Sequence, residues 1–592
     1  MKKHIQSFIF TVKMIISIHK KLFFIVVFLA VFTSIFPVIS LTFTQNILNI
    51  IHSLDAPFHE IIMWIAISFT FSIIVSIIQN VYSYFNNQLS VFLMYRMNYL
   101  LMDKCSKLSL EQLEETATYE MMSRLEGEIS SKPYQALSSL ISLLSSSVIF
   151  SITLVILFNW KVEIFFLLSA ISILSFWLHL KVADREFKMR FNRSSKERKV
   201  WYYSFLLTRD TAFKEVKVLN LKYYFLNRYW SLVKAFIESE NEINRTQMLI
   251  NLGLVLLQDA SSSIILFLSM RETYLGIILI GTAIFYTSVT SMFQNSISNL
   301  ASNIYALYNS SLYMLLLKDF LNTKENEKEG GLTIDSVERI EVCDLAYHYP
   351  NNYQALQNLN FKIEKGESVA IVGKNGSGKS TLLKLLSGLY EPTDGTIKIN
   401  GINLTKIDDN SYKKEISVLF QDFLKFEATL LENIQIGDVD REVNKLSIKN
   451  ALKSANVNFL KNNEDYLYDR FLGNWFEDGS QLSGGEWQKI ALARAYYKKA
   501  SLYILDEPSS ALDVIAEMKI FEHFFKRKKN KIGIFITHRV KVARQADKII
   551  VLDQGEIMSV GTHNYLYESC EFYKELFLKE KELDEFNINA DN

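Results

Sequence analysis

Six long apolar stretches alternate with polar segments in the first half of the chain. They lie near 22–44, 61–82, 135–158, 162–181, 248–268 and 274–294. Each has about 20 residues, which is enough to cross roughly 30 Å of hydrocarbon as an α-helix. We therefore predict a membrane α-helical bundle of six transmembrane helices within residues 21–321.

The charges between these stretches orient the helices. Residues 45–60 contain no Lys or Arg, whereas the long segments 83–134 and 182–247 are rich in both. Positively charged loops remain in the cytoplasm. We therefore predict that both long segments and both termini are cytoplasmic, and that the helices continue beyond the membrane.

Shorter polar pieces separate the remaining helices. Asn159–Lys161 and Arg271–Thr273 are predicted to be tight outer turns. Within the long inner loops, Leu113–Tyr119 and Thr208–Glu215 fit either bends between two helices or ordinary solvated turns. The sequence alone leaves these two interpretations open.

The first 20 residues mix apolar runs with scattered basic positions. A signal peptide is one interpretation, but no small-residue cleavage site follows. We predict instead that 1–20 form an amphipathic elbow helix at the membrane surface.

The character of the chain changes after residue 321. Residues 322–331 are charged and end in two glycines, as expected of a solvated linker. From 332 onward, short β-prone runs alternate with helical segments. Two of them, 339–342 and 360–363, alternate polar and apolar positions as strands do. We predict a soluble α/β domain over 332–592.

Composition agrees with a membrane protein that carries a soluble domain. The 592 residues are 49% hydrophobic and only 21% charged. A net charge of +1 gives no general attraction to nucleic acid. Cys105, Cys343 and Cys570 are far apart, and their odd number argues against a disulfide framework.

The α/β domain contains a phosphate-binding loop. The short apolar run 368–372 is predicted to be a buried strand, and a helical segment begins near 382. Between them stand Gly373, Lys374, Asn375, Gly376, Ser377, Gly378, Lys379, Ser380 and Thr381, which match G-x-x-x-x-G-K-[ST]. Glycines let successive N–H groups turn toward one anion, and a helix N-terminus adds positive partial charge. We expect Lys379 to reach the phosphates and Ser380 to ligate Mg²⁺.

A pair of carboxylates follows a second apolar run, 502–504. Asp506 at the end of a buried strand beside a phosphate loop can hold Mg²⁺ through water. Glu507 is then placed to act as the general base toward water.

A second glycine turn carries the resemblance to a known family. Leu482, Ser483, Gly484, Gly485 and Gln488 form L-S-G-G-E-W-Q, which resembles the signature of ATP-binding cassette (ABC) proteins. The resemblance implies that this turn acts in trans, on the γ-phosphate bound by a partner cassette.

Four further motifs follow the family order. Tyr349 corresponds to the aromatic residue that stacks on adenine, and Gln421 to the glutamine that senses Mg²⁺ and the membrane domain. Ser510 and Asp513 match the loop that crosses the dimer interface, and His538 the histidine that contacts the γ-phosphate.

The resemblance implies the fold and the assembly. It indicates an exporter-type six-helix bundle fused to an α/β P-loop cassette that binds ATP and Mg²⁺. One chain supplies one phosphate loop and one signature, so a homodimer is expected, although a different partner chain stays open. The two inner bends would then be the coupling helices that dock on the cassettes.

Closer likeness points to a cargo. Val418–Phe423, Leu472–Phe476, Trp487–Arg494 and the inner stretch 206–215 look like the nisin and subtilin transporters. This implies export of a modified lantibiotic precursor, a Gram-positive source, and partners that include a dehydratase and a cyclase. The first span begins near residue 22, leaving no room for a leader peptidase, so we expect the leader to stay attached. A multidrug or lipid exporter, and an ATP-gated channel or regulator, remain alternatives.

One carboxylate lies in the middle of a predicted span. Asp259 stands among apolar residues and serines, where a charge costs about 2.5–3.5 kcal/mol. It should therefore face the interior of the bundle. It is either a contact for a cationic peptide or a structural hydrogen-bonding group for a neighbouring Ser or Thr.

Overall fold

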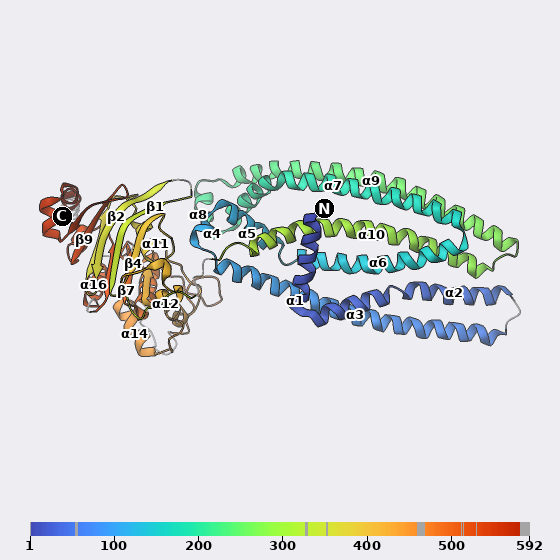
Figure 1. The fold of residues 1–592 in the computed structure, drawn as a ribbon, viewed down its shortest axis with the longest axis horizontal. Coiled ribbons are helices and arrows are strands. Elements are labelled where there is room, and N and C mark those ends of the chain that lie inside the picture. The colour runs from blue at the N-terminus through green and yellow to red at the C-terminus, as the bar shows by residue number, and fades with distance from the viewer. Residues whose placement is uncertain are drawn as a thin grey trace. The chain divides into compact units, whose positions relative to one another are not determined.

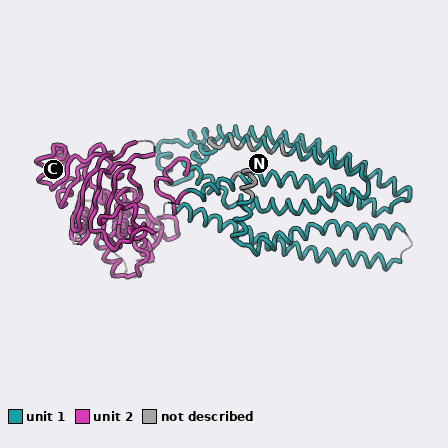
Figure 2. The backbone as a smooth tube through the Cα atoms, in the orientation of Figure 1, with its two compact units in different colours: residues 1–106, 119–323 teal, residues 107–118, 324–592 magenta. Residues whose placement is uncertain are grey.

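The computed structural model describes residues 2–53, 57–325, 330–350, 353–458, 468–510, 512, 514–527 and 530–579. The chain forms two compact units (Figure 2). The helical unit comprises Met1–Ser106 and Tyr119–Thr323, and the sheet unit comprises Lys107–Thr118 and Lys324–Asn592. A short piece of the first inner loop thus belongs with the C-terminal domain.

The helical unit consists of long helices joined by short connections. They are α1 (Lys2–Thr33), α2 (Phe36–Ser53), α3 (Phe58–Ser106), α5 (Thr116–Glu128), α6 (Lys132–Trp160), α7 (Val162–Thr208), α8 (Asp210–Val218), α9 (Lys222–Tyr274) and α10 (Ile280–Leu321). The chain doubles back so that α7 packs along α9 and α6 packs along α10 (Figure 1).

Within the described residues, five helical segments are long and apolar enough to cross a membrane. They are Ile9–Ser53, Phe58–Ser106, Lys132–Trp160, Val162–Glu186 and Lys222–Tyr274. These contain the first five predicted spans. The sixth predicted stretch lies mostly in α10. The packed face of α10 includes three buried polar residues, Thr290, Gln294 and Ser296.

The turn before α10 lies further along the chain than predicted. Arg271–Thr273 lie in the last turn of α9, and the non-helical connection is 275–279. Gly276 ends the helix with φ of +72°, and Ile277 donates its N–H to the carbonyl of Glu272. A left-handed glycine is the usual end of a helix. The turn was predicted at 271–273 because charge was taken as the signal, but these residues are helical and Glu272 pairs with Lys161.

The first predicted span is also interrupted. α1 kinks at His19, one residue before the predicted end of the elbow, and it stops at Thr33. α2 begins at Phe36, one residue before Pro37. Proline cannot donate the helical hydrogen bond and crowds the preceding turn. The stretch 22–44 therefore contains two helical pieces instead of one.

Stacked aromatic residues join α6 to α10 within a core shared by four helices. Trp160 stacks on Tyr286 with ring centroids 4.1 Å apart, and Phe150 stacks on Phe293 at 5.3 Å. The surrounding core is apolar and is built from α6, α7, α9 and α10. Burying such side chains provides most of the stability of a packed interface.

The sheet unit contains two sheets. The strands are β1 (Arg339–His348), β2 (Gln354–Glu364), β3 (Ser368–Gly373), β4 (Asp394–Ile399), β5 (Ile402–Asn403), β6 (Ile416–Leu419), β7 (Leu502–Asp506), β8 (Ile532–Ile536), β9 (Lys548–Asp553) and β10 (Glu556–Gly561). One antiparallel sheet has the order β2-β1-β4-β5. The other has the order β10-β9-β3-β8-β7-β6, and its strands are parallel except for β10. The predicted strands 339–342 and 360–363 lie in β1 and β2.

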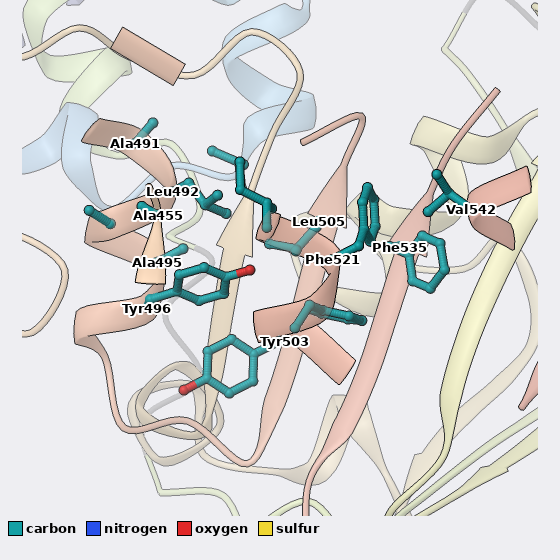
Figure 3. Close-up of a cluster of buried hydrophobic side chains, with 14 of the residues drawn as sticks. Ala455, Ala491, Leu492, Ala495, Tyr496, Tyr503, Leu505, Phe521, Phe535 and Val542 are labelled. Atoms are coloured by element: carbon teal, nitrogen blue, oxygen red, sulfur yellow. The ribbon is translucent and has the colours of Figure 1, made fainter. Parts of the chain in front are cut away.

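Helices cover the sheets. They are α4 (Leu110–Glu114), α11 (Lys379–Leu386), η1 (Leu404–Lys406), α12 (Asp409–Glu415), α13 (Leu430–Gln435), α14 (Lys445–Ser454), α15 (Gly484–Tyr497), α16 (Val514–Arg527), α17 (Val540–Ala543) and α18 (His563–Ser569). One hydrophobic core joins α14, α15 and α16 to the parallel sheet, with Tyr503, Leu505 and Phe535 contributed by the strands (Figure 3). A second core lies between the two sheets and α11.

Candidate nucleotide site

The phosphate loop is formed where β3 leads into α11. All six residues of β3 are buried, as expected of a strand between two parallel neighbours. Gly378 has φ of +95° and caps α11. At Gly373 a Cβ atom would lie 2.1 Å from the carbonyl oxygen of Leu552. Gly378 is therefore required for its backbone conformation, and Gly373 is required because the neighbouring chain packs closely against it.

The loop contains polar groups that a phosphate would satisfy. The Lys379 Nζ donates to the carbonyl oxygens of Gly373 at 3.0 Å and Lys374 at 2.8 Å. Burial lowers the pKa of this ammonium, and the charges of Glu507 and Asp506 oppose that effect. Among the described residues, the buried Ser377 Oγ has no hydrogen-bond partner. An anionic ligand would supply acceptors to this loop.

Asp506, the last residue of β7, lies beside the loop. Burial raises the pKa of its carboxyl to about 6, and the hydrogen bond from Ser380 and the charge of Lys379 partly counteract this. A divalent cation would favour the ionised carboxylate. Ser380, Gln421 and Asp506 offer only oxygen ligands, which suit Mg²⁺ that is also bound by substrate phosphates.

The raised pKa of Asp506 predicts how the stability of the fold depends on pH. A carboxyl whose pKa is higher in the folded chain binds more protons there, so it costs stability as the pH rises from about 4 to about 6. Asp506→Asn should therefore stabilise the nucleotide-free protein at pH 7.5 by about 1–2 kcal/mol. The gain should be smaller at pH 5. Thermal unfolding at both pH values measures it.

The exposed Asp335 provides a control for this prediction. Asp335→Asn should leave the unfolding temperature unchanged at both pH values. A variant at Asp506 that is destabilised at pH 7.5 would show that the ionised carboxylate is favourably bound without a cation, contrary to the prediction.

Three side chains from neighbouring strands meet at the site. Gln421 follows β6, Glu507 follows β7 and His538 follows β8. The Gln421 Nε2 donates to the Glu507 Oε2 at 3.1 Å, and the His538 Nε2 lies 2.5 Å from the Glu507 Oε1. Glu507 adopts φ of +46°, a left-handed conformation that is strained for a residue with a side chain. The carboxylate is thus held by two partners on a strained turn.

These residues line one cavity of about 580 Å³. Its lining consists of Tyr349, Tyr353, Ala355, Asn375, Gly376, Gly378, Lys379, Ser380, Thr381, Gln421, Glu507 and His538. Most of the predicted loop residues are included. Lys374 is not, because its Nζ lies over the ring of Phe572, 4.9 Å from the centroid. Tyr353 was not predicted from the sequence, although an aromatic residue four positions after Tyr349 was a signal for it.

The signature residues form a separate surface. Ser483 caps α15 in a capping box with Glu486, and Ser483 and Gly484 are exposed. Leu482 packs on the core, and neither these residues nor Gly485 are among the described residues that line the cavity. The structure of one chain therefore does not bring the signature to its own phosphate loop.

Gln488 is buried behind the signature and connects it to the turn that contains Glu507. Its Nε2 donates to the carbonyl of Glu507 at 3.0 Å and to the Ser510 Oγ at 3.2 Å. Ser510 itself is exposed. Asp513, predicted in the same loop, lies outside the described residues.

Asp259 does not face the interior of the single helical unit. It is exposed, whereas Leu254, Ser261, Ile265 and Ser269 form the buried face of α9. The nearby Ser261 accepts a hydrogen bond from Gln294. Among the described residues, Asp259 itself has no hydrogen bond or ion pair. In one chain Asp259 thus lies on the face of α9 opposite the buried one, and its orientation toward the interior of a two-chain bundle stays a prediction.

Known proteins resemble this chain over nearly its whole length. The ABC transporter family matches residues 356–510. The subtilin transport ATP-binding protein of Bacillus subtilis is 40% identical, with 96% of this chain and 93% of that protein covered. The nisin transport ATP-binding protein of Lactococcus lactis is 37% identical, with 96% of each covered.

A solved structure shows the same fold. A bacterial Atm1-family ABC exporter with ATP bound superposes with a TM-score of 0.81, over 94% of this chain and 97% of that one, at 20% identity. The fold of the two units and the phosphate-loop cavity fit one family. The two relatives, which match almost the full chain, belong to that family as well. This chain therefore belongs to the ABC exporters, in the group that includes the subtilin and nisin transport ATP-binding proteins.

Proposed function

We propose that this multi-pass membrane protein exports a leader-bearing lantibiotic precursor across the cytoplasmic membrane. ATP hydrolysis coupled to transport is the activity of its family. The observation that carries the cargo is the likeness to both lantibiotic transporters over 96% of the chain, because it includes the helical unit that would contact a peptide. Cytoplasmic termini, a Gram-positive source and cooperation with a dehydratase and a cyclase belong to the same proposal.

Two copies of the chain are proposed to form the working transporter, since exporters of this type act as dimers. The exposed signature of one copy, with Ser483 at the N-terminus of α15, would complete the cavity of the other. A helix N-terminus offers unpaired N–H groups and positive partial charge to a phosphate. Closure of two sheet units on ATP would then be transmitted through the inner bends near α4 and α8.

The cavity residues have distinct proposed roles. Tyr349 would stack on the adenine, and the loop amides with Lys379 would bind the phosphates. Mg²⁺ held by Ser380, Gln421 and Asp506 would neutralise phosphate charge. Glu507 would accept a proton from water at Oε1 or Oε2, while Gln421 and His538 orient that carboxylate. His538 could turn from Glu507 to the γ-phosphate when nucleotide is present.

Transport in inverted membrane vesicles tests the cargo. ATP should drive uptake of a thioether-bridged peptide that carries its leader, and uptake should exceed that of a hydrophobic dye or a labelled lipid. Transport of dye or lipid without peptide would favour the multidrug or lipid alternative. ATP-gated ion current without sustained hydrolysis would favour a channel, which the intact Glu507 site argues against.

Asp259 provides a prediction within this function. On the exposed face of α9, its carboxylate would contact the cationic peptide in the dimer. Asp259→Asn should reduce export of a cationic precursor severalfold. Export from vesicles is the measurement, with Asp319→Asn, an exposed aspartate near the end of α10, as the control. Unchanged export by the variant would remove Asp259 from the peptide path.

A further inference from the structure

A cluster of tyrosines lies between the first inner loop and the nucleotide cavity, entirely within the sheet unit. The tyrosine pair, Tyr347 and Tyr390, is stacked with centroids 5.0 Å apart and planes 5° from parallel. Each is only 2% exposed. The ring of Tyr349 is nearly perpendicular to both, with centroids 5.1 Å from Tyr347 and 6.0 Å from Tyr390. Tyr349 therefore packs against the tyrosine pair.

Tyr349 is held from the cavity side as well. Its hydroxyl lies 3.0 Å from the Thr381 Oγ1 on α11. The ring of Tyr353 lies 6.4 Å away at 29° and lines the same cavity. Aromatic pairs of this kind stabilise each other beyond the burial of their surface. The orientation of Tyr349 is thus set by its neighbours instead of being free.

Two carboxylates from α4 accept hydrogen bonds from the hydroxyls of the tyrosine pair. The α4 carboxylates, Glu111 and Glu114, stand three residues apart and so share one face of the helix. The Tyr347 hydroxyl donates to the Glu111 Oε1 at 3.1 Å, and the Tyr390 hydroxyl donates to the Glu114 Oε2 at 2.6 Å. Burial and these carboxylates raise the pKa of both hydroxyls, which therefore remain donors.

The phosphate-loop helix takes part in the same cluster. The Lys384 Nζ on α11 donates to the Tyr390 hydroxyl at 2.9 Å and lies 3.4 Å from the Glu114 Oε1. α4 is further fixed by Leu110, which packs on the core of the sheet unit, and by the capping box of Ser109 with Gln112. Figure 2 accordingly colours 107–118 with the sheet unit.

We propose that α4 positions Tyr349 through the tyrosine pair, so that affinity for the adenine base depends on the α4 carboxylates. The inference rests on the proposed role of Tyr349 in stacking on adenine. Coupling between two binding events is reciprocal. If contact with α4 strengthens binding of the base, the bound base strengthens the contact with α4 by the same factor. The phosphates, bound by the loop amides and Lys379, lie outside this dependence.

Equilibrium binding to the full-length protein with two probes tests the proposal. ATP carries a base, and inorganic tripolyphosphate does not. Glu114→Gln and Tyr390→Phe should each weaken ATP binding about 3- to 10-fold, as loss of a charge-assisted hydrogen bond would, and should leave tripolyphosphate binding unchanged. The KM for ATP should rise while kcat stays within about twofold. The double variant should bind ATP no more weakly than the single variant with the larger defect, because both changes break the contact between Tyr390 and Glu114.

Tyr412→Phe is the matched control. Tyr412 is a fully buried tyrosine of the same core whose hydroxyl donates to the carbonyl of Leu386 at the end of α11. Its loss should affect stability without changing the ratio of ATP to tripolyphosphate affinity. Equal weakening of both probes in the α4 or Tyr390 variants, or no weakening of ATP binding, would overturn the proposal.

Two further measurements separate the proposal from its premise. Tyr349→Ala should weaken ATP but not tripolyphosphate, and no change would show that the stacking role itself is wrong. Hydrogen exchange in residues 107–118 should slow when ATP binds to the wild-type protein and should respond less in Tyr390→Phe. Identical slowing in that variant would contradict the link even if Tyr349 stacks on the base.

Discussion

Two inactive variants of this chain, Lys379→Ala and Ser483→Arg, should regain ATP hydrolysis when they assemble into one dimer. Each site would combine the phosphate loop of one chain with the signature of the other. Both sites are defective in either homodimer, so hydrolysis should fall at least about 100-fold. The mixed dimer places both defects in one site and leaves the other intact. It should approach about half of wild-type activity if the sites act additively.

Purification through two different tags isolates the mixed dimer, and steady-state phosphate release measures its activity. The matched control mixes Lys379→Ala with Glu507→Gln. Both residues line the cavity of their own chain, so every site in that dimer is defective and no recovery is expected. Recovery in the control, or none in the test pair, would show that the signature does not act across the dimer.

Glu507→Gln should bind ATP and fail to hydrolyse it. The amide keeps the shape of the side chain and its contact with Gln421, but it cannot accept a proton from water. Loss of a general base costs about 10²- to 10⁴-fold in turnover, while ATP affinity should change little because Lys379 and the loop amides are intact. Single-turnover hydrolysis and equilibrium ATP binding measure the two effects.

Glu415→Gln is the control for that variant, because its carboxylate accepts a hydrogen bond from Ser501 and does not line the cavity. It should hydrolyse ATP at close to the wild-type rate. If Glu507→Gln keeps substantial hydrolysis, another group activates the water, and the assignment of the base is wrong.

The grouping of Gln421, Glu507 and His538 in one site was predicted from the family resemblance, and the strand order explains it physically. Gln421, Glu507 and His538 are far apart in sequence, yet each follows a strand of one parallel sheet, and β6, β7 and β8 are neighbours. The carboxyl ends of parallel strands meet at one edge. Local motifs therefore identified a site whose members only the sheet brings together. The phosphate loop was predictable for a simpler reason, since its glycines act within one turn.

Other features depend on contacts that no local pattern encodes. Nothing near Glu111 or Glu114 indicates that these carboxylates bind tyrosines more than 200 positions later. The exposed orientation of Asp259 depends on which face of α9 packs against its neighbours. The turn at 275–279 was misplaced because charge was taken as the signal, whereas Gly276 ends the helix.

The hydrogen bonds of Gln488 have a consequence for cooperativity. In the proposed dimer, α15 presents its signature to one ATP molecule while Gln488 holds the backbone of Glu507, which serves the other. A shift of α15 on closure would therefore also move the carbonyl of Glu507. The two hydrolysis events would then be linked in timing, and any shortfall of the mixed dimer below half of wild-type activity would measure how strongly one site waits for the other.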